Sequence, residues 1–285
     1  MMPKGPLLDI LSLPSAQRQL IIVQPDHVVV AAREAEKTRA ESPPPAAGNN
    51  AQFMMALIMA VISPWSLLIS TTALEGVKAW AKAREGGLDI LLIAHSEAAP
   101  LQFPPGHPRT QTMYVAHPAA SSVYYTTASF HRMAFEHKFS EAIRLLMGLG
   151  ASRITVEHIR GWSEEFSTAF SMGLGSEKIK ASAGANGSTS SKILFNATFQ
   201  NHSAPVIPEG LVWYPHEPTW QTIAAGRLKH GLQEFSLNVT YEDDFGVNAG
   251  LKTRAQGAGF ELGGSFEDHV ATVWTLQGEF TPRER

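Results

Sequence analysis

Along the last part of the chain, apolar side chains alternate with small or polar ones. Between 166 and 175, one face carries Phe166, Thr168, Phe170, Met172 and Leu174, and the other carries only serine, alanine and glycine. A repeat of two residues is produced by an extended strand. The same alternation returns at 178–185, 193–200, 235–241, 245–251, 260–266 and 270–280. We therefore predict about seven amphipathic strands in one large, mostly antiparallel sheet, either open or closed like a barrel.

The strongest helical pattern lies at 130–149. Its apolar residues follow one stripe of a helix: Phe130, Met133, Ala134, Phe139, Ile143, Leu146 and Met147. Gly148 and Gly150 end the pattern, and Ile154 and Val156 begin another strand within a few residues. We expect this amphipathic helix to pack across the sheet, which gives an α+β fold.

Shorter signals fill the rest of the chain. We expect helices at 7–13, 75–85 and 220–228, strands at 20–23, 28–30, 88–94 and 113–116, an irregular loop at 95–112, and turns at Asp26 and Asp243–Asp244. Charged residues at 33–41 read as a helix end, and the proline-rich stretch 43–50 reads as a linker. The predicted domains are 1–50 (N-terminal segment and linker), 51–110 (apolar helical segment, charged helix and strand) and 111–285 (α+β domain with a C-terminal meander).

Residues 53–74 carry no charge. In a helix that rises about 1.5 Å per residue, a run of this length can cross a hydrocarbon core of about 30 Å. Ser63-Pro64 in the middle and Ser70 to Thr72 near the end fit equally well with a buried core helix or a helix-turn-helix. Under either reading the apolar side chains contact a membrane or a partner protein, or the sheet itself: Phe53, Met54, Leu57, Ile58, Val61, Trp65 and Leu68.

Composition excludes several classes of function. Charged residues make up 17% of the 285 residues, which is low, and the net charge of -3 does not supply the positive field that nucleic-acid binding needs. There are no cysteines, so disulfides, thiolate metal sites and thiol catalysis are excluded. The N-terminus is not a convincing secretory signal. We expect a cytoplasmic location, with membrane association if 53–74 inserts.

No motif identifies an enzyme. His131 and His137 are six residues apart, roughly 120° from eclipsed on a helix, so with Glu136 they do not face one metal ion. His95, His107 and His117 surround the proline-rich loop with no ligand spacing, and neither a nucleophile motif nor a phosphate loop is present. We expect no cofactor and no metal.

Small residues are concentrated at 173–191 and 246–264. Glycine weakens a strand, so its frequent use needs a reason. Three explanations of these glycines are open: close approach of a helix or second sheet, curvature of the sheet with bulges, or strands that place lipid and water on opposite faces of a transmembrane barrel.

One stretch resembles a known family. Residues 184–191, Gly-Ala-Asn-Gly-Ser-Thr-Ser-Ser, are followed by an alternating strand and then by Pro218-Thr219-Trp220-Gln221-Thr222-Ile223. This order resembles a portion of the gasdermin pore-forming domain, which would imply membrane pores. The chain departs from that family in the helix at 130–149, which has no matching counterpart, and in lacking the N-terminal cysteine that is acylated in bacterial members.

Low charge, the uncharged run and smooth amphipathic strands favour a non-enzymatic membrane-acting protein, either pore-forming or membrane-inserting, of the effector or toxin-like kind. The alternative is a soluble binding or assembly subunit of a larger complex, in which the sheet or a partner buries 53–74. Both readings predict a homo-oligomer or complex subunit and no nucleic acid. An enzyme of another type is the third possibility, supported only by the histidine clusters.

Overall fold

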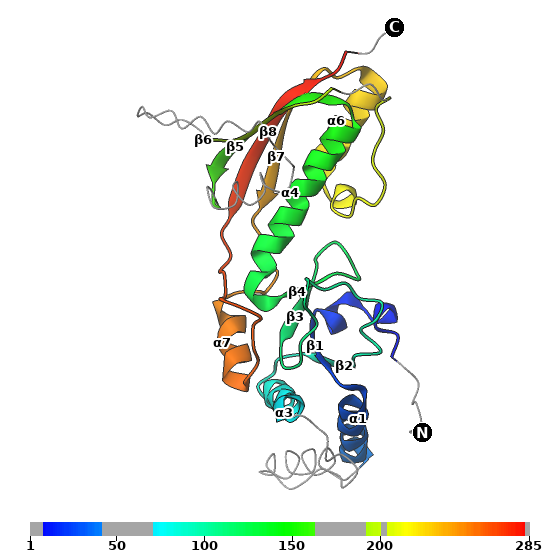
Figure 1. Cartoon of the computed structure of the whole chain (residues 1–285), viewed down its shortest axis with the longest axis vertical. Coiled ribbons are helices and arrows are strands. Elements are labelled where there is room, and N and C mark those ends of the chain that lie inside the picture. Colours follow the sequence, from blue (N-terminus) through cyan, green and yellow to red (C-terminus); the bar gives the residue numbers. More distant parts are fainter. Residues whose placement is uncertain (1–7, 42–70, 163–191, 201–203, 283–285) are drawn as a thin grey trace. The chain divides into compact units, whose positions relative to one another are not determined.

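The computed structural model describes residues 8–41, 71–162, 192–200 and 204–282. These residues form both helices and sheets, in keeping with the predicted α+β class. The chain divides into two compact units: unit 1 comprises 1–132 and 245–268, and unit 2 comprises 133–244 and 269–285. The described residues of each unit form one four-stranded sheet (Figure 1). The predicted single large sheet is therefore corrected to two smaller ones.

Unit 1 contains a mixed sheet with the order β2-β1-β3-β4. Its strands are β1 (Leu20–Gln24), β2 (Leu91–Ala94), β3 (Met113–Ala116) and β4 (Tyr124–Thr126). Its helices are α1 (Asp26–Glu41), α3 (Thr71–Glu85) and α7 (Ala249–Ala258), with 3-10 turns η1 (Ile10–Ser12), η2 (Ser15–Arg18) and η4 (Thr127–Ser129). β1 and β2 are parallel, which requires a crossover, and the other pairs are antiparallel.

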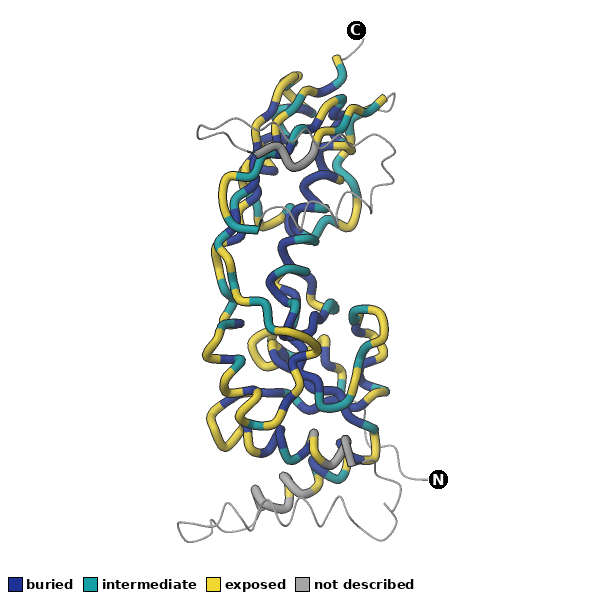
Figure 2. Tube along the Cα trace, turned by 60° about the vertical axis from the view of Figure 1, so that its left-hand side comes forward, coloured by how far each residue is buried: buried dark blue, intermediate teal, exposed yellow. Residues whose placement is uncertain are grey.

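The core of unit 1 follows from the apolar run in β1. Ile21 and Val23 lie on one face of the strand and pack with Ile93, Tyr114 and Tyr124. The helices α1 and α3 contact β2 and β1, respectively, and bury Val28 and Trp80, among other residues. Figure 2 traces the described chain along its Cα atoms and colours its buried residues dark blue.

The prediction of a strand at 28–30 after a turn at Asp26 is wrong, because these residues lie in α1. Three consecutive valines favour a strand locally. The Pro25 carbonyl nevertheless accepts the N–H groups of Val28 and Val29, which starts a helix. Val28, Val29 and Ala32 are then buried on one helical face, so tertiary packing overrides the local preference.

The predicted strands at 245–251 and 260–266 are wrong as well. Residues 249–258 form α7, and the described chain at 260–266 has only an isolated bridge between Glu261 and Thr112. Asn248 caps the helix by accepting the N–H groups of Gly250 and Leu251, and Gly259, with φ 105°, ends it. The hairpin turn predicted at Asp243–Asp244 is therefore wrong too: the chain turns at Phe245 and Gly246, both with positive φ, and α7 rather than a second strand follows.

Unit 2 contains an antiparallel sheet with the order β6-β5-β8-β7. Its strands are β5 (Ala151–Arg160), β6 (Lys192–Thr198), β7 (Glu234–Tyr241) and β8 (Thr272–Phe280). Its helices are α4 (Phe130–Gly148), whose first three residues belong to unit 1, α6 (Pro218–His230) and the 3-10 turn η5 (Tyr214–His216). The strong helical pattern at 130–149 and the strands predicted at 193–200, 235–241 and 270–280 are confirmed.

In unit 2, α4 runs along one face of the sheet (Figure 1). Phe135 and Phe139 meet Trp274 of β8 edge to face, with ring centroids 5.0 and 4.8 Å apart. Along β7, buried residues alternate strictly with exposed ones, so the amphipathic pattern of the sequence marks the face that α4 covers.

Both sheets are open, because the described strands at their two ends do not pair with each other. The barrel-like form of the prediction is thus not seen. The strands predicted at 166–175 and 178–185, and the part of the apolar run at 53–70, lie outside the described residues. In the described part of the chain, no helix combines the length and apolarity needed to cross a membrane.

Candidate functional site

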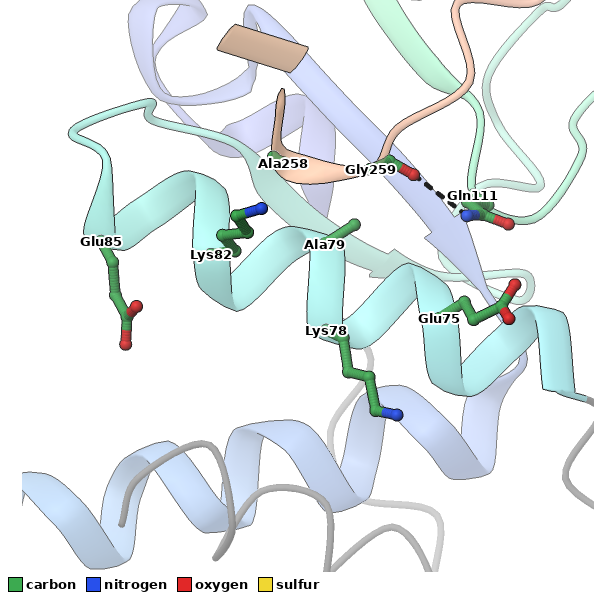
Figure 3. Close-up of a pocket in the computed structure, with 8 residues that line it drawn as sticks. All are labelled: Glu75, Lys78, Ala79, Lys82, Glu85, Gln111, Ala258 and Gly259. Carbon is green, nitrogen blue, oxygen red and sulfur yellow. Dashed lines mark hydrogen bonds between the residues drawn. The ribbon is translucent and has the colours of Figure 1, made fainter. Parts of the chain in front are cut away.

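A groove in unit 1 lies between α3 and the end of α7 and has a volume of about 480 Å³ (Figure 3). Its lining residues combine small apolar side chains with charges of both signs: Glu75, Lys78, Ala79, Lys82, Glu85, Gln111, Ala258 and Gly259. Lys82 and Ala79 point toward Ala258, whereas Lys78 and Glu85 point to the other side of α3. The lining contains no nucleophile beside a base, so the groove fits binding better than catalysis.

Gln111 holds the wall of this groove. Its backbone is left-handed, with φ 66°, a conformation that costs energy in a residue other than glycine. Two hydrogen bonds with the segment after α7 stabilise this conformation. Gln111 Nε2 donates to the Gly259 carbonyl over 3.0 Å, and the Gln111 carbonyl accepts the Glu261 N–H over 3.1 Å. Gln111 therefore fixes the segment after α7 against the loop before β3.

The histidines considered in the sequence do not converge. The His107 ring bonds Tyr114 Oη over 2.7 Å, His117 Nδ1 accepts the N–H groups of Ala119 and Ala120, and His131 bonds the Val247 carbonyl. Burial and the nearby Arg109 lower the pKa of His107, which favours its neutral form. In the described ranges, no three metal-ligating side chains gather at one point.

Glu97 is a carboxylate of unit 1 that accepts several hydrogen bonds, and its side chain is 2% exposed. Arg33 donates from both terminal nitrogens, over 2.6 and 2.8 Å, and the N–H groups of Ala94 and Leu8 donate over 2.9 and 2.8 Å. Burial alone would raise the pKa of Glu97. The hydrogen bonds from Arg33, Ala94 and Leu8 outweigh burial and hold that pKa below its ordinary value of 4.5.

This lowered pKa predicts that acid destabilises unit 1. Glu97 is easier to protonate in the unfolded chain, so its stabilising contribution is complete above pH 4.5 and is lost as the pH falls through the folded-state pKa. Urea unfolding at pH values from 7 to about 3 should show a steeper fall in stability for the natural chain than for Glu97→Gln. Glu85→Gln, at an exposed site, is the control. Equal slopes for the natural chain and Glu97→Gln would contradict this prediction.

Unit 2 holds a second buried carboxylate, at Glu141 of α4, which is 1% exposed. Its oxygens accept three successive backbone N–H groups, those of Val212, Trp213 and Tyr214, each over 2.7 Å. One turn away, Lys138 bonds Glu217 over 2.5 Å and the Thr240 carbonyl over 2.8 Å. These bonds fasten the segment before α6 to α4. They satisfy the carboxylate fully and therefore indicate a structural anchor.

The sheet of unit 2 presents a polar surface on the side away from α4. Cross-strand neighbours on this surface are polar side chains: Asn196, Thr155, Gln277 and Ser236 in one row, and Glu157, Thr275 and Asn238 in the next. Thr275 Oγ1 donates to Asn238 Oδ1 over 2.8 Å. Among the residues named here, this surface carries neither aromatic platforms nor clustered cations, so they offer nothing specific to nucleic acid.

At one end of that sheet, no described strand pairs with the outer edge of β7, which is called the free edge below. Phe280 N donates to the Gln233 carbonyl, so Gln233 and every second residue after it bond to β8. The N–H and C=O groups of the residues between them therefore point away from β8: Glu234, Ser236, Asn238 and Thr240. Lys138 takes the Thr240 carbonyl. In the described residues, the outward backbone groups of Glu234, Ser236 and Asn238 have no protein partner. Sequence reasoning predicted the strand but not that it ends the sheet.

The membrane or partner contacts predicted from the sequence lie outside the described residues: Phe53, Met54, Leu57, Ile58, Val61, Trp65 and Leu68. Of the stretch that resembles the gasdermin domain, residues 184–191 also lie outside the described residues. Residues 218–223 form the first turns of α6, in which Trp220 is completely buried. Comparison with protein-family models, with curated proteins and with solved structures finds no match to the chain.

Proposed function

We propose that the chain is a non-enzymatic assembly protein whose copies join through the sheet of unit 2. The observation that carries this proposal is the free edge of β7, with the outward N–H and C=O groups of Glu234, Ser236 and Asn238. Unpaired backbone groups on a regular strand are a template for another strand. The polar groups of the described sites support assembly rather than catalysis, because they are engaged in structural bonds: His107, His117, His131, Glu97 and Glu141.

β7 lacks most of the features by which proteins block such an edge. It is eight residues long, and it contains no proline, lysine or bulge. Lys138, reaching from α4, guards only the end at Thr240. The remaining edge is long enough for several main-chain hydrogen bonds with a second strand.

Sedimentation velocity of the full chain tests this proposal against Ser236→Pro. Proline removes the outward N–H of Ser236, leaves the ladder to β8 intact, and is tolerated in edge strands. We expect concentration-dependent oligomers for the natural chain and a folded monomer for Ser236→Pro. Ser236→Thr, which keeps the N–H, should behave like the natural chain. If proline perturbs folding, Ser236→Lys supplies a charged block at the same place.

Two results would overturn the proposal. One is a natural chain that stays monomeric at every concentration tested. The other is a set of oligomers that Ser236→Pro and Ser236→Lys leave unchanged, which would place assembly elsewhere. Circular dichroism and cooperative unfolding of each variant show whether a loss of oligomers comes from the edge or from misfolding.

Membrane action is the second candidate, favoured by where one connection joins the sheet. β5 and β6 are antiparallel neighbours, and 161–191 leaves after Arg160 and returns at Lys192 at the same end of this pair. The alternating sequence at 166–175 and 178–185 is therefore tied to an existing strand pair, as the strands of a membrane-inserting hairpin would be. Dye release from anionic liposomes by the full chain, and its loss when 166–185 is replaced by a glycine-serine linker, would support this candidate. An absence of release and of liposome binding would remove it.

A further inference from the structure

We infer that the strand added to β7 is β7 of a second copy, antiparallel and related by a two-fold axis at Ser236. The inference rests on the proposed assembly function and identifies its partner and geometry. The other end of the sheet, β6, is a poor alternative, because the register of its pairing with β5 shifts between Val156 and Glu157. Such an irregularity interrupts the straight row of groups that strand addition needs. β7 pairs with β8 without any shift, so its edge is regular.

The free groups select one register. When Ser236 faces Ser236 of the second copy, Glu234 faces Asn238 of the second copy, and all outward groups of these three residues are paired across the axis. An axis at Leu237 or Asn238 would require Thr240, whose carbonyl Lys138 already occupies. An axis at Glu234 would place two carboxylates opposite each other, and an axis at Phe235 would leave Asn238 unpaired.

Side chains support the same register. Within one copy, Glu234 lies opposite Glu279, so a like charge is its neighbour on β8. Asn238 Oδ1 already accepts a hydrogen bond from Thr275, which leaves the amide NH₂ as a donor. In the proposed register, the Asn238 amide of the second copy lies beside Glu234, on the side away from β8, and can donate a hydrogen bond to its carboxylate. The two-fold axis repeats this contact, so each dimer contains two of them.

The buried side of the strand is compatible with this pairing. Phe235 and Leu237 lie on the face that α4 covers and are 7% and 0% exposed. In the proposed register, Phe235 is opposite Leu237 of the second copy, so an apolar pair continues the core across the axis. The two sheets then form one continuous eight-stranded sheet, and a closed dimer results because the interface is isologous.

Single-cysteine cross-linking tests this geometry, since the natural chain contains no cysteine. In Ser236→Cys the two Cα atoms should be about 5.5 Å apart, inside the range for a disulfide. In the matched control Asn238→Cys, the two positions are offset by four residues, about 14 Å along the strands, which is beyond that range. We expect mild oxidation to convert Ser236→Cys mainly to a covalent dimer and to leave Asn238→Cys monomeric on a non-reducing gel.

The outcomes separate this inference from the proposed function. Cross-linking of Asn238→Cys or Thr240→Cys in preference to Ser236→Cys would overturn the register. Oligomers larger than dimers, without cross-linking at any of the three positions, would overturn the two-fold pairing and leave assembly standing. A natural chain that sediments only as a monomer would overturn both.

Discussion

Replacing Glu141 by alanine is expected to lower the free energy of unfolding of unit 2 by about 4 kcal/mol. The carboxylate is 1% exposed and accepts the N–H groups of Val212, Trp213 and Tyr214. Alanine removes three charge-assisted hydrogen bonds and leaves backbone donors without an acceptor in a region that water reaches poorly. Urea unfolding followed by tryptophan fluorescence measures the effect, because Trp213 lies in the segment that is released.

Two further variants show whether the hydrogen bonds are the cause. Glu141→Gln keeps the shape but offers one oxygen and a clashing NH₂ group, so an intermediate loss of about 2 kcal/mol is expected. Glu209→Ala removes an exposed carboxylate from the same connecting segment and should change stability by less than about 0.5 kcal/mol. If Glu141→Ala is as stable as Glu209→Ala, the carboxylate does not hold the segment before α6.

Elements with a strong, regular pattern could be predicted from the sequence. The stripe from Phe130 to Met147 gave α4, and strict alternation gave β7 and β8, since in each case one face is buried along the whole element. Met113–Ala116 was bounded correctly because the strand is short and apolar between polar loops. In these places local preference and tertiary packing agree.

The rest depended on partners far along the chain. α7 is weakly amphipathic and follows an alternating stretch, and only the pair Asn248 and Gly259 at its ends distinguishes it as a helix. The return of 245–268 to unit 1 from within unit 2 has no local signal, because it depends on contacts such as Gln111 with Gly259. The free edge of β7 was equally hidden, since strand order cannot be read from a pattern that shows only which face is buried.

The assembly and membrane proposals depend on different parts of unit 2. Strand addition at β7 needs only the described edge, where three residues offer unpaired backbone groups. Membrane insertion depends on the sequence at 166–185, which lies in the chain between β5 and β6, the two strands farthest from β7 in the sheet order. The Ser236 variants and the 166–185 replacement therefore change different parts of the chain, and each can fail without affecting the other.

Gly278→Ala is expected to destabilise unit 2 by more than about 3 kcal/mol. Gly278 lies in β8 between Ile154 of β5 and Phe235 of β7. A Cβ atom there would overlap the Arg153 carbonyl oxygen and lie 2.8 Å from Phe235 Cζ. The register between β5 and β8 shifts between Ala151 and Arg153, directly beside this close contact. Thermal and urea unfolding of the variant measure the loss.

Paired substitutions identify which contact causes this loss. Phe235→Leu in the Gly278→Ala background removes the outer part of the ring, including the Cζ atom, but leaves the Arg153 backbone in place, so stability should not recover. Gly257→Ala makes the same substitution in α7, where an added Cβ meets nothing within 4 Å, and should stabilise by about 0.5–1 kcal/mol. Opposite signs for these two alanines would show that close approach of β5, rather than glycine content, explains Gly278. Recovery by Phe235→Leu would instead identify the aromatic ring as the obstacle.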